Sequence, residues 1–594
     1  MQTSKQRLLS LKAVFTKRNM LIAWKTVRNG LRNQDLDDLH DYLDVHRNRD
    51  AFVWRLRADV LTGRYRPNEA TIISLEKKHG IGRRLMLPTP ADALLLQTLV
   101  NAIEPRLRRR QPSKAAHYAR SHRPPAEDSV DATFPYPWWQ LWPQFQQRIW
   151  NFTNVKAYVV VTDVANYFDS IPLGTLRDSV ASLARLEQPV LDFLFFLLEA
   201  FVWRPDYIPL SGVGLPQLNF DAPRLLGHCY LFPIDRLIDS ATQAHYVRWM
   251  DDINFGVDSE SDARALLSNI DTRLNMLGVR LNVAKTKILS ATQAQSHFQL
   301  QENRQLTILG NSYQYGSRST LLRQLITVLL EERYDRFRAA PRDGAWTKVL
   351  KRYYTVFGKA QHDVLEAEVP THLKNYADVR ASIFRYYRAL GFSIDRLDHI
   401  HDYITDHCTD DASLFGACRL LTEWEIAVRS VGRARMITLA GWLRLNGQNR
   451  VSAFCGGLWL LAKYGSTRRL WDYIQRTGAV WQRSAWAARQ VASVFPRLST
   501  YHRRRVHQYF AGGGLLEALQ VSAHITELER VQRLDQQLKS YFTHPPTPPY
   551  AYPLGKVVML IAMKSGSLTA RDKAWLMTRV NAIVTDPVYR ELLA

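Results

Sequence analysis

The chain has 594 residues, of which 46% are hydrophobic and 23% charged, a composition typical of a folded protein of roughly two to four domains. Its 79 lysines and arginines against 55 acids give a net charge of +24, which favours a polyanionic partner, nucleic acid before membrane. The longest apolar run, residues 193–203, is broken by Glu199 and is far shorter than the ~20 residues of a membrane span, and no secretory signal is evident. Four widely spaced cysteines argue against a CxxC zinc site and a disulfide framework, so we expect a cytoplasmic protein with no membrane partner.

The first hundred residues combine helices with a short hairpin. Residues 1–65 and 91–103 have the apolar spacing of helices, and residues 71–75 and 84–87 have that of short strands. A basic turn, Lys77-Lys78-His79-Gly80, joins the two strands.

Prolines and aromatic residues alternate in residues 124–150, after a basic stretch at residues 106–123. Because proline lacks a backbone N–H and interrupts helices, we expect an ordered loop or insertion here. Its tryptophans and tyrosines either cover a hydrophobic surface or a neighbouring domain, or they stack on bases.

The middle of the chain alternates strands and helices. The spacing predicts strands at residues 158–162 and 279–281, helices at residues 173–203 and 262–277, and a strand–turn–strand unit at residues 246–257. Beyond about residue 320 only helix-period patterns continue, so we expect an α-helical array in the C-terminal part.

Two adjacent acids, Asp251 and Asp252, lie at the turn of the strand–turn–strand unit. Neighbouring carboxylates repel each other and are costly to bury unless a cation joins them. Most such pairs are solvated turn residues, but a third acid, Asp163, ends a separate apolar strand upstream. Since Mg²⁺ prefers oxygen ligands and bridges carboxylates to phosphates, we expect Mg²⁺ at these acids, with Mn²⁺ as the alternative ion.

Five stretches, in order, resemble motifs A to E of the reverse transcriptase palm. They are residues 163–171, 214–217, 249–252, 278–287 and 308–311. Upstream, residues 83–88 with Asp92, and residues 117–120, resemble the fingers motifs of the retron and group II intron reverse transcriptases. The order of the five motifs makes the resemblance more specific than any single motif would be.

The resemblance implies an α/β right-hand polymerase fold, with fingers and an antiparallel palm sheet, followed by a large all-α region. We expect N-terminal helices and fingers in residues 1–155, with the insertion near 124–150, and the palm in residues 156–318. Residues 319–594 would form a thumb-like helical region and a helical array.

The implied activity is addition of deoxynucleotides to a 3′-hydroxyl, with metal ions held by separated acids. Asp163, Asp251 and Asp252, with the backbone carbonyl of Val164, are the expected metal ligands. Lys285 is the expected acid for the pyrophosphate leaving group, and a surface lysine is the alternative.

The resemblance also assigns residues to the nucleotide and the primer. The nucleotide-binding residues are Lys77, Lys78, Arg83, Arg84, Tyr167, Phe168 and Gln217. The primer and palm residues are Trp249, Met250, Leu309 and Gly310. Phe168 would form the sugar gate that excludes a 2′-hydroxyl, with a core aromatic as the alternative, and the basic turn is alternatively a solvated β-turn.

Two departures from the family pattern concern the template. Trp249 stands where the family has tyrosine, and Leu218 stands where glycine follows Leu-Pro-Gln. The second position normally lies under the nascent base pair. The resemblance therefore leaves two modes open: template-independent or protein-primed synthesis, and conventional RNA-templated cDNA synthesis from a non-coding RNA.

No RNase H or integrase acid pattern follows residue 320. A palm with a large helical C-terminal part resembles the abortive-infection and defence-associated reverse transcriptases of bacteria, which implies a role in antiviral defence. The expected partners are dNTPs and the DNA product, with a non-coding RNA, a partner protein or a second copy of the chain as further candidates. A catalytically silent nucleic-acid scaffold is the opposing hypothesis, and the retention of the three acids and Lys285 argues against it.

Overall fold

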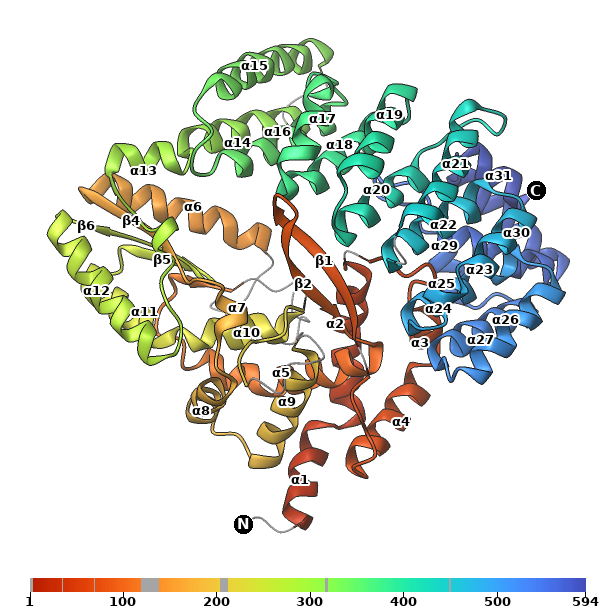
Figure 1. Cartoon of the computed structure of the whole chain (residues 1–594), viewed down its shortest axis with the longest axis horizontal. Coiled ribbons are helices and arrows are strands. Elements are labelled where there is room, and N and C mark those ends of the chain that lie inside the picture. Colours follow the sequence, from red (N-terminus) through yellow and green to blue (C-terminus); the bar gives the residue numbers. More distant parts are fainter. Residues whose placement is uncertain are drawn as a thin grey trace.

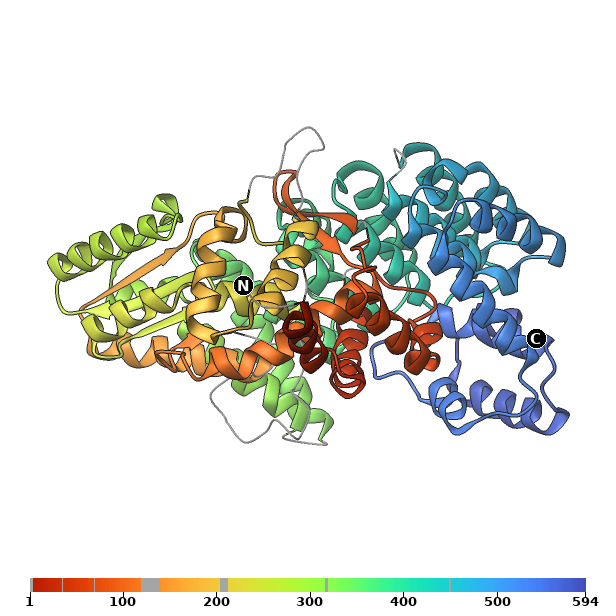
Figure 2. The same ribbon diagram turned by 90° about the horizontal axis from the view of Figure 1, so that it is seen from below.

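A computed structural model of the protein describes residues 4–34, 36–68, 70–118, 138–202, 212–218, 220–315, 319–447 and 450–594. Figure 1 shows a sheet-containing unit and a helical array side by side, with the hairpin of β1 (Thr71–Lys78) and β2 (Ile81–Leu87) between them. The perpendicular view in Figure 2 shows the same arrangement. None of the described helices is both long and apolar enough to cross a membrane.

The N-terminal helices and the hairpin confirm the predicted elements. The helices are α1 (Ser4–Val14), α2 (Lys17–Arg32), α3 (Leu43–Arg47), α4 (Arg49–Leu61) and α5 (Pro90–Arg108). Thr16 and Thr89 begin α2 and α5 by accepting a hydrogen bond from a backbone N–H of the first turn, and Pro90 follows at the first helical position.

The central sheet has five strands in the order β3-β5-β6-β4-β7. They are β3 (Ala116–His117), β4 (Tyr158–Asp163), β5 (Tyr246–Trp249), β6 (Asp252–Val257) and β7 (Lys287–Ser290). β3 and β5 are parallel and the other neighbours antiparallel. The predicted strand ending at Asp163 and the strand–turn–strand unit are confirmed.

Helices cover both faces of this sheet. Because side chains alternate along a strand, Val159 and Val247 face one side and Val160 and Phe255 the other. The first side packs against α6 (Trp138–Val155) and α13 (Ala291–His297), and the second against α11 (Phe232–Thr242) and α12 (Glu260–Met276). The predicted helix before Gly278 is thus confirmed.

The expected loop at residues 124–150 is wrong from residue 138 onward, where α6 forms a helix of five turns. Its internal proline, Pro143, lies near the N-terminal end, where few carbonyls lose a partner. The apolar face of α6, with Phe145, Ile149 and Phe152 buried on the sheet, outweighs that loss. Residues 119–137, including the rest of the basic and proline-rich stretches, lie outside the described residues.

Two smaller predictions need correction, at residues 173–203 and 279–281. The stretch 173–203 is two helices, α8 (Leu173–Ala184) and α9 (Gln188–Phe201), because Arg185 adopts a left-handed conformation with φ of 48°. The stretch 279–281 is not a strand, because only Leu281 makes a bridge, to Val164. Leu309 and Gly310, the residues expected at the primer, lie within helix α14 (Leu300–Tyr315).

The C-terminal part confirms the predicted helical array. Its inner helices pack in succession, each on the next, as Figure 1 shows. They are α16 (Trp346–Ala360), α18 (Arg380–Leu390), α20 (Asp411–Glu423), α22 (Val451–Tyr464), α25 (Ala485–Ser493), α27 (Leu516–Arg530) and α29 (Leu554–Ser565).

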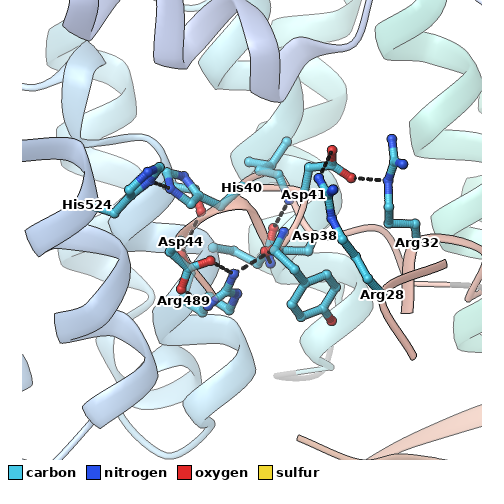
Figure 3. Close-up of polar contacts among 12 residues, drawn as sticks. Arg28, Arg32, Asp38, His40, Asp41, Asp44, Arg489 and His524 are labelled. Atoms are coloured by element: carbon cyan, nitrogen blue, oxygen red, sulfur yellow. Dashed lines mark hydrogen bonds and ion pairs between the residues drawn. The ribbon is translucent and has the colours of Figure 1, made fainter. Parts of the chain in front are cut away.

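Buried polar contacts fix the array to the N-terminal part of the chain. Arg489 of α25 donates to the carboxylates of Asp38, at 2.8 Å, and Asp44, at 2.6 and 2.9 Å, and the ring nitrogens of His40 and His524 lie 2.7 Å apart (Figure 3). All five side chains are buried.

The hairpin is held in the same way. The backbone N–H and hydroxyl of Ser74 donate to Asp411 at 2.8 and 2.6 Å, and Arg380 donates to Glu76 at 2.7 Å. The array is therefore a structural support for the N-terminal half of the chain, not an appendage.

Candidate active site

The three predicted acids meet at one end of the central sheet. Asp163, the last residue of β4, pairs with Asp252, the first residue of β6. Asp251 lies in the turn before β6, and its carbonyl accepts a hydrogen bond from the N–H of Val164 at 3.3 Å. Antiparallel pairing thus brings together residues that are 88 and 89 positions apart in the sequence.

A buried arginine, Arg248, holds the turn between β5 and β6 in place. Arg248 donates to the carbonyl of Met250 at 2.7 Å, and Met250 has a left-handed φ of 55°. The same guanidinium donates to both carboxylate oxygens of Asp235 at 2.7 and 2.6 Å, and neither side chain is exposed. Burial alone would lower the pKa of Arg248, but Asp235 outweighs it and raises this pKa. The sequence signal for this positioning residue is a lone arginine in an otherwise apolar strand.

The negative charges of Asp163, Asp251 and Asp252 are not balanced by the positive charges around them. Burial first, and then the neighbouring Asp252, raise the pKa of Asp251 to about 6. Burial also raises the pKa of Asp252, although the charge of Lys348 opposes it. Among the described residues, atom Oδ1 of Asp163 has no hydrogen-bond partner, and it is buried.

Lys285 is the cation nearest to Asp163. Its ammonium forms an ion pair and hydrogen bond with Oδ2 of Asp163. Burial alone would lower the pKa of Lys285, but the hydrogen bond and charge of Asp163 outweigh this effect and raise it.

Within the described ranges, no three acidic, histidine or cysteine side chains are already gathered around a metal position. The expected metal ligands are therefore adjacent but not preassembled. Their chemistry still fits a hard divalent cation: three carboxylates, an unpartnered buried oxygen on Asp163 and a raised pKa on Asp251 and Asp252. Such a cation would offset the repulsion that the lysine leaves.

The nucleotide-binding candidates of the centre lie close to this end of the sheet. Phe168 is half-buried beside Tyr167, at a ring distance of 5.6 Å. A Cβ on Gly227 would lie 3.3–3.6 Å from the side chains of Tyr167, Phe168 and Met250, so these three converge there. Tyr167 is buried and its hydroxyl donates to the carbonyl of Gly227, so it is a core residue. Gln217 donates to Asp169, one residue after Phe168, at 2.6 Å.

The four basic candidates lie on the hairpin and are exposed; they are Lys77, Lys78, Arg83 and Arg84. Lys77 and Lys78 are at its tip. The base of the hairpin contacts the centre through the N–H of Met86, which donates to the carbonyl of Gln217 at 3.1 Å. The structure therefore joins the base of the hairpin to the Phe168 region and leaves the lysines at the far end.

Trp249 is enclosed by aromatic side chains. Its ring lies 5.7 Å from those of Trp142 and Phe145 of α6, and 6.0 Å from that of His117. Burial, and then nearby arginines, lower the pKa of His117 to about 4. Trp142 thus covers a hydrophobic surface, in agreement with one of the two expectations for the aromatic stretch.

A cavity of about 160 Å³ lies between α6, the sheet and α16, and Asp252 and Lys348 both line it. The ammonium of Lys348 also lies 5.5 Å from the centre of the Trp142 ring. Lys348 follows Asp252 by 96 positions in a helix, so no local pattern pointed to it.

Leu309 and Gly310, the expected primer residues, lie on α14, which packs on α16. A Cβ on Gly310 would meet Val356 of α16 at 3.5 Å. The structure thus separates them from the sheet that carries Trp249 and Met250.

Comparison with known proteins shows what the segment around this centre is similar to. Residues 93–313 match the family model described as reverse transcriptase (RNA-dependent DNA polymerase). A search of curated proteins gave no match. The matched segment therefore has a polymerase palm and fingers fold, and the chain is a nucleotidyltransferase of the RNA-directed DNA polymerase type. The hairpin of β1 and β2 and the helical array lie outside the match.

Proposed function

We propose that the chain is a Mg²⁺-dependent DNA polymerase that adds deoxynucleotides to a 3′-hydroxyl, with Mn²⁺ as a substitute ion. The observation that carries this proposal is the meeting of Asp163, Asp251 and Asp252 beside Lys285, within a segment that matches reverse transcriptases. Acids held together with raised pKa values are costly to a fold and are typical of functional sites.

Each side chain has a distinct task in this proposal. Asp163, Asp251 and Asp252, with the carbonyl of Val164, would hold the metal ions, which when bound activate the hydroxyl and neutralise phosphate charge. Lys285, whose raised pKa keeps it protonated, gives a proton to the leaving pyrophosphate. Arg248 positions the turn through the carbonyl of Met250.

Phe168 limits the space beside the sugar and so favours deoxynucleotides. Its half-buried ring, fixed between Tyr167 and Met250 over Gly227, supports this role. The hairpin lysines Lys77 and Lys78, together with Arg83 and Arg84, would contact the triphosphate if the hairpin tip bends toward the centre.

For the mode of synthesis we favour template-independent or protein-primed addition. Asp252 faces the side of the sheet on which α6 packs, and the cavity of about 160 Å³ that it lines there is too small to hold a duplex. Trp142 and Phe145 hold Trp249 against that side. Conventional RNA-templated synthesis is the second candidate, supported by the family that the palm matches.

A role in antiviral defence rests on the resemblance of the motifs and on the helical array that follows the palm. The test is phage challenge of cells that express the wild-type chain or Asp251→Asn/Asp252→Asn. Protection by the wild type alone supports the role, and equal plaque counts contradict it.

The polymerase itself is tested with nuclease-treated protein, Mg²⁺ and labelled dNTPs, with and without a primed RNA template. We expect the wild-type protein to incorporate dNTPs without added template, and the Asp251→Ala/Asp252→Ala variant to incorporate none. A product whose mobility changes on protease digestion would reveal a protein primer. Incorporation only with the template would establish the second candidate. If no dNTP is incorporated under any condition, the polymerase proposal is contradicted and the catalytically silent scaffold is supported.

A further inference from the structure

A second, larger recess lies in the helical array, apart from the catalytic acids. Its volume is about 1040 Å³, and it is bounded by α14, α15 (Thr320–Ala339), α16, α18 and the loop before α29. We call it the distal groove. Its basic and aromatic lining residues include Arg323, Lys359, Arg385, Tyr313, Phe392 and Tyr550. The volume is at the upper end of the roughly 300–1,000 Å³ of small-molecule pockets, which suits a segment of a chain.

Three of the cations that line the groove are available to a ligand. In the part of the chain that the structure describes, Arg323, Lys359 and Arg385 have no carboxylate partner, and all three are exposed. Lys359 donates to the side-chain oxygen of Gln314 at 2.8 Å, and Arg385 donates to Ser382 at 3.0 Å and to the carbonyl of Ala381 at 3.3 Å. The guanidinium of Arg323 lies 5.7 Å from the centre of the Tyr313 ring. Phosphates would gain charge-assisted contacts here without displacing an ion pair.

The two acids that line the groove already have partners within the protein. Glu423 forms an ion pair with Arg388, and Glu425 accepts a hydrogen bond from Thr585. The guanidinium of Arg388 also lies 4.7 Å from the centre of the Tyr550 ring and so fixes the loop that closes the groove. The net field of the groove therefore favours an anion.

Aromatic rings on the walls favour a nucleic-acid strand over a simple anion. Tyr550 is 41% exposed, although Arg388 and Arg419 lie 4.7 and 5.7 Å from the centre of its ring, and Tyr313 and Phe392 are half-buried. Cationic grooves lined with aromatic side chains bind single strands, because the backbone follows the charges and the bases stack on the rings.

Helix α16 connects this groove to the polymerase centre. Lys348, near its N-terminal end, lines the cavity of Asp252, and Lys359, near its C-terminal end, lines the groove. Eleven residues of helix span ~16 Å, which corresponds to about five nucleotides at 3.4 Å per nucleotide. A strand that leaves the centre along α16 would thus reach the groove after a few additions.

We propose that the distal groove binds single-stranded DNA, namely the strand that the polymerase makes. The identity of this strand rests on the proposed function, whereas binding of single-stranded DNA by the groove does not. The two are therefore tested separately.

The experiment measures binding of 5′-fluorescein dT12 to the full-length chain by anisotropy across a salt series. The groove variant is Lys359→Gln/Arg385→Gln. The control is Arg468→Gln/Arg469→Gln, which removes the same charge from exposed positions of α23 (Thr467–Arg476), outside the groove. We expect the groove variant alone to bind about tenfold more weakly, with a salt slope smaller by about 1.4.

Equal affinity of the groove and control variants would overturn the proposal, whether or not the protein incorporates dNTPs. Groove-dependent binding of dT12 without any incorporation would support the groove and contradict the proposed polymerase. Groove-dependent binding of a polyglutamate peptide, with none of dT12, would overturn the proposal and indicate an acidic protein partner instead.

Discussion

Two groups of buried acids in this chain have opposite surroundings. In the interface between the N-terminal segment and the array, Asp38 and Asp44 share the guanidinium of Arg489. Burial alone would raise the pKa of Asp44, but Arg489 outweighs it and holds this pKa far below its ordinary value. At the end of the central sheet, the pKa of Asp251 is instead raised to about 6, by burial and by Asp252.

The difference separates a structural cluster from the acids that the proposed function makes reactive. The interface satisfies its charges within the protein and so contributes to the fold. The sheet end leaves the charges of its acids unbalanced, at a cost to the fold, and in the proposed function a metal ion would offset them. Substitutions in the two places should therefore have opposite effects on stability and activity.

Asp251→Asn should have the largest effect, and on activity alone. Removing one metal-binding charge should lower incorporation by about 10⁴-fold, or about 5 kcal/mol in barrier, as measured by single-turnover assays. The urea midpoint of the metal-free protein at pH 7.5 should stay level or rise, because a repulsion is removed. A clear fall in that midpoint would place Asp251 with the structural acids and contradict the comparison.

Arg489→Met should have the reverse effect. It leaves Asp38 and Asp44 buried without their cation, which typically costs about 3–5 kcal/mol of unfolding free energy. The control is Arg435→Met, which removes an exposed partner of Asp398 and should cost less than about 1 kcal/mol. Equal urea midpoints for the two variants would show that the interface cluster contributes no more than a surface pair.

The two regions should also respond to pH in opposite senses. Burial, and then His40, lower the pKa of His524 from 6.5 to about 3, so protons bind the unfolded chain more tightly. The stability from this residue is full above pH 6.5 and is lost as the pH falls toward 3. For Asp251 the pKa is raised from 3.8 to about 6, so protons bind the folded state, and the metal-free fold loses stability as the pH rises through this range.

Urea midpoints of metal-free protein between pH 4 and 8 measure both slopes. His524→Asn should reduce the loss on the acid side, and Asp251→Asn should reduce the loss between pH 4 and 6. If either variant keeps the wild-type profile, the corresponding residue does not carry the effect.

The sequence was sufficient where the relevant pattern is local. The strand before Asp163 and the turn at Asp251 follow from apolar runs that end in acids, and antiparallel pairing then brings them together. The prolines of residues 124–150 predict a loop, but in α6 the apolar spacing of Phe145, Ile149 and Phe152 outweighs the single internal Pro143. A local sequence pattern predicts a helix or strand, but not the surface on which that helix or strand packs.

Contacts between distant segments were beyond reach for the same reason. Arg489 lies 445 residues from Asp44 in the sequence, and no local pattern near either residue predicts their contact. The distal groove gathers side chains from α14 to the loop at Tyr550, and its shape depends on how the array stacks. A buried arginine or lysine reveals its partner only once the helices are placed.

Lys348 offers the smallest and most specific test of the comparison, because it is a residue of the array whose charge acts on an acid at the end of the central sheet. Its charge lowers the pKa of Asp252 against the effect of burial, and both residues line the same cavity. Lys348→Gln should therefore raise the pKa of Asp252, move the acid limb of the activity profile to higher pH and lower neutral-pH incorporation a few-fold. Lys351→Gln, one turn away and paired with Asp378 at 2.7 Å, is the matched control and should leave the limb in place. If both variants lower activity without moving the limb, α16 acts through stability alone, and the array supports the polymerase without tuning its acids.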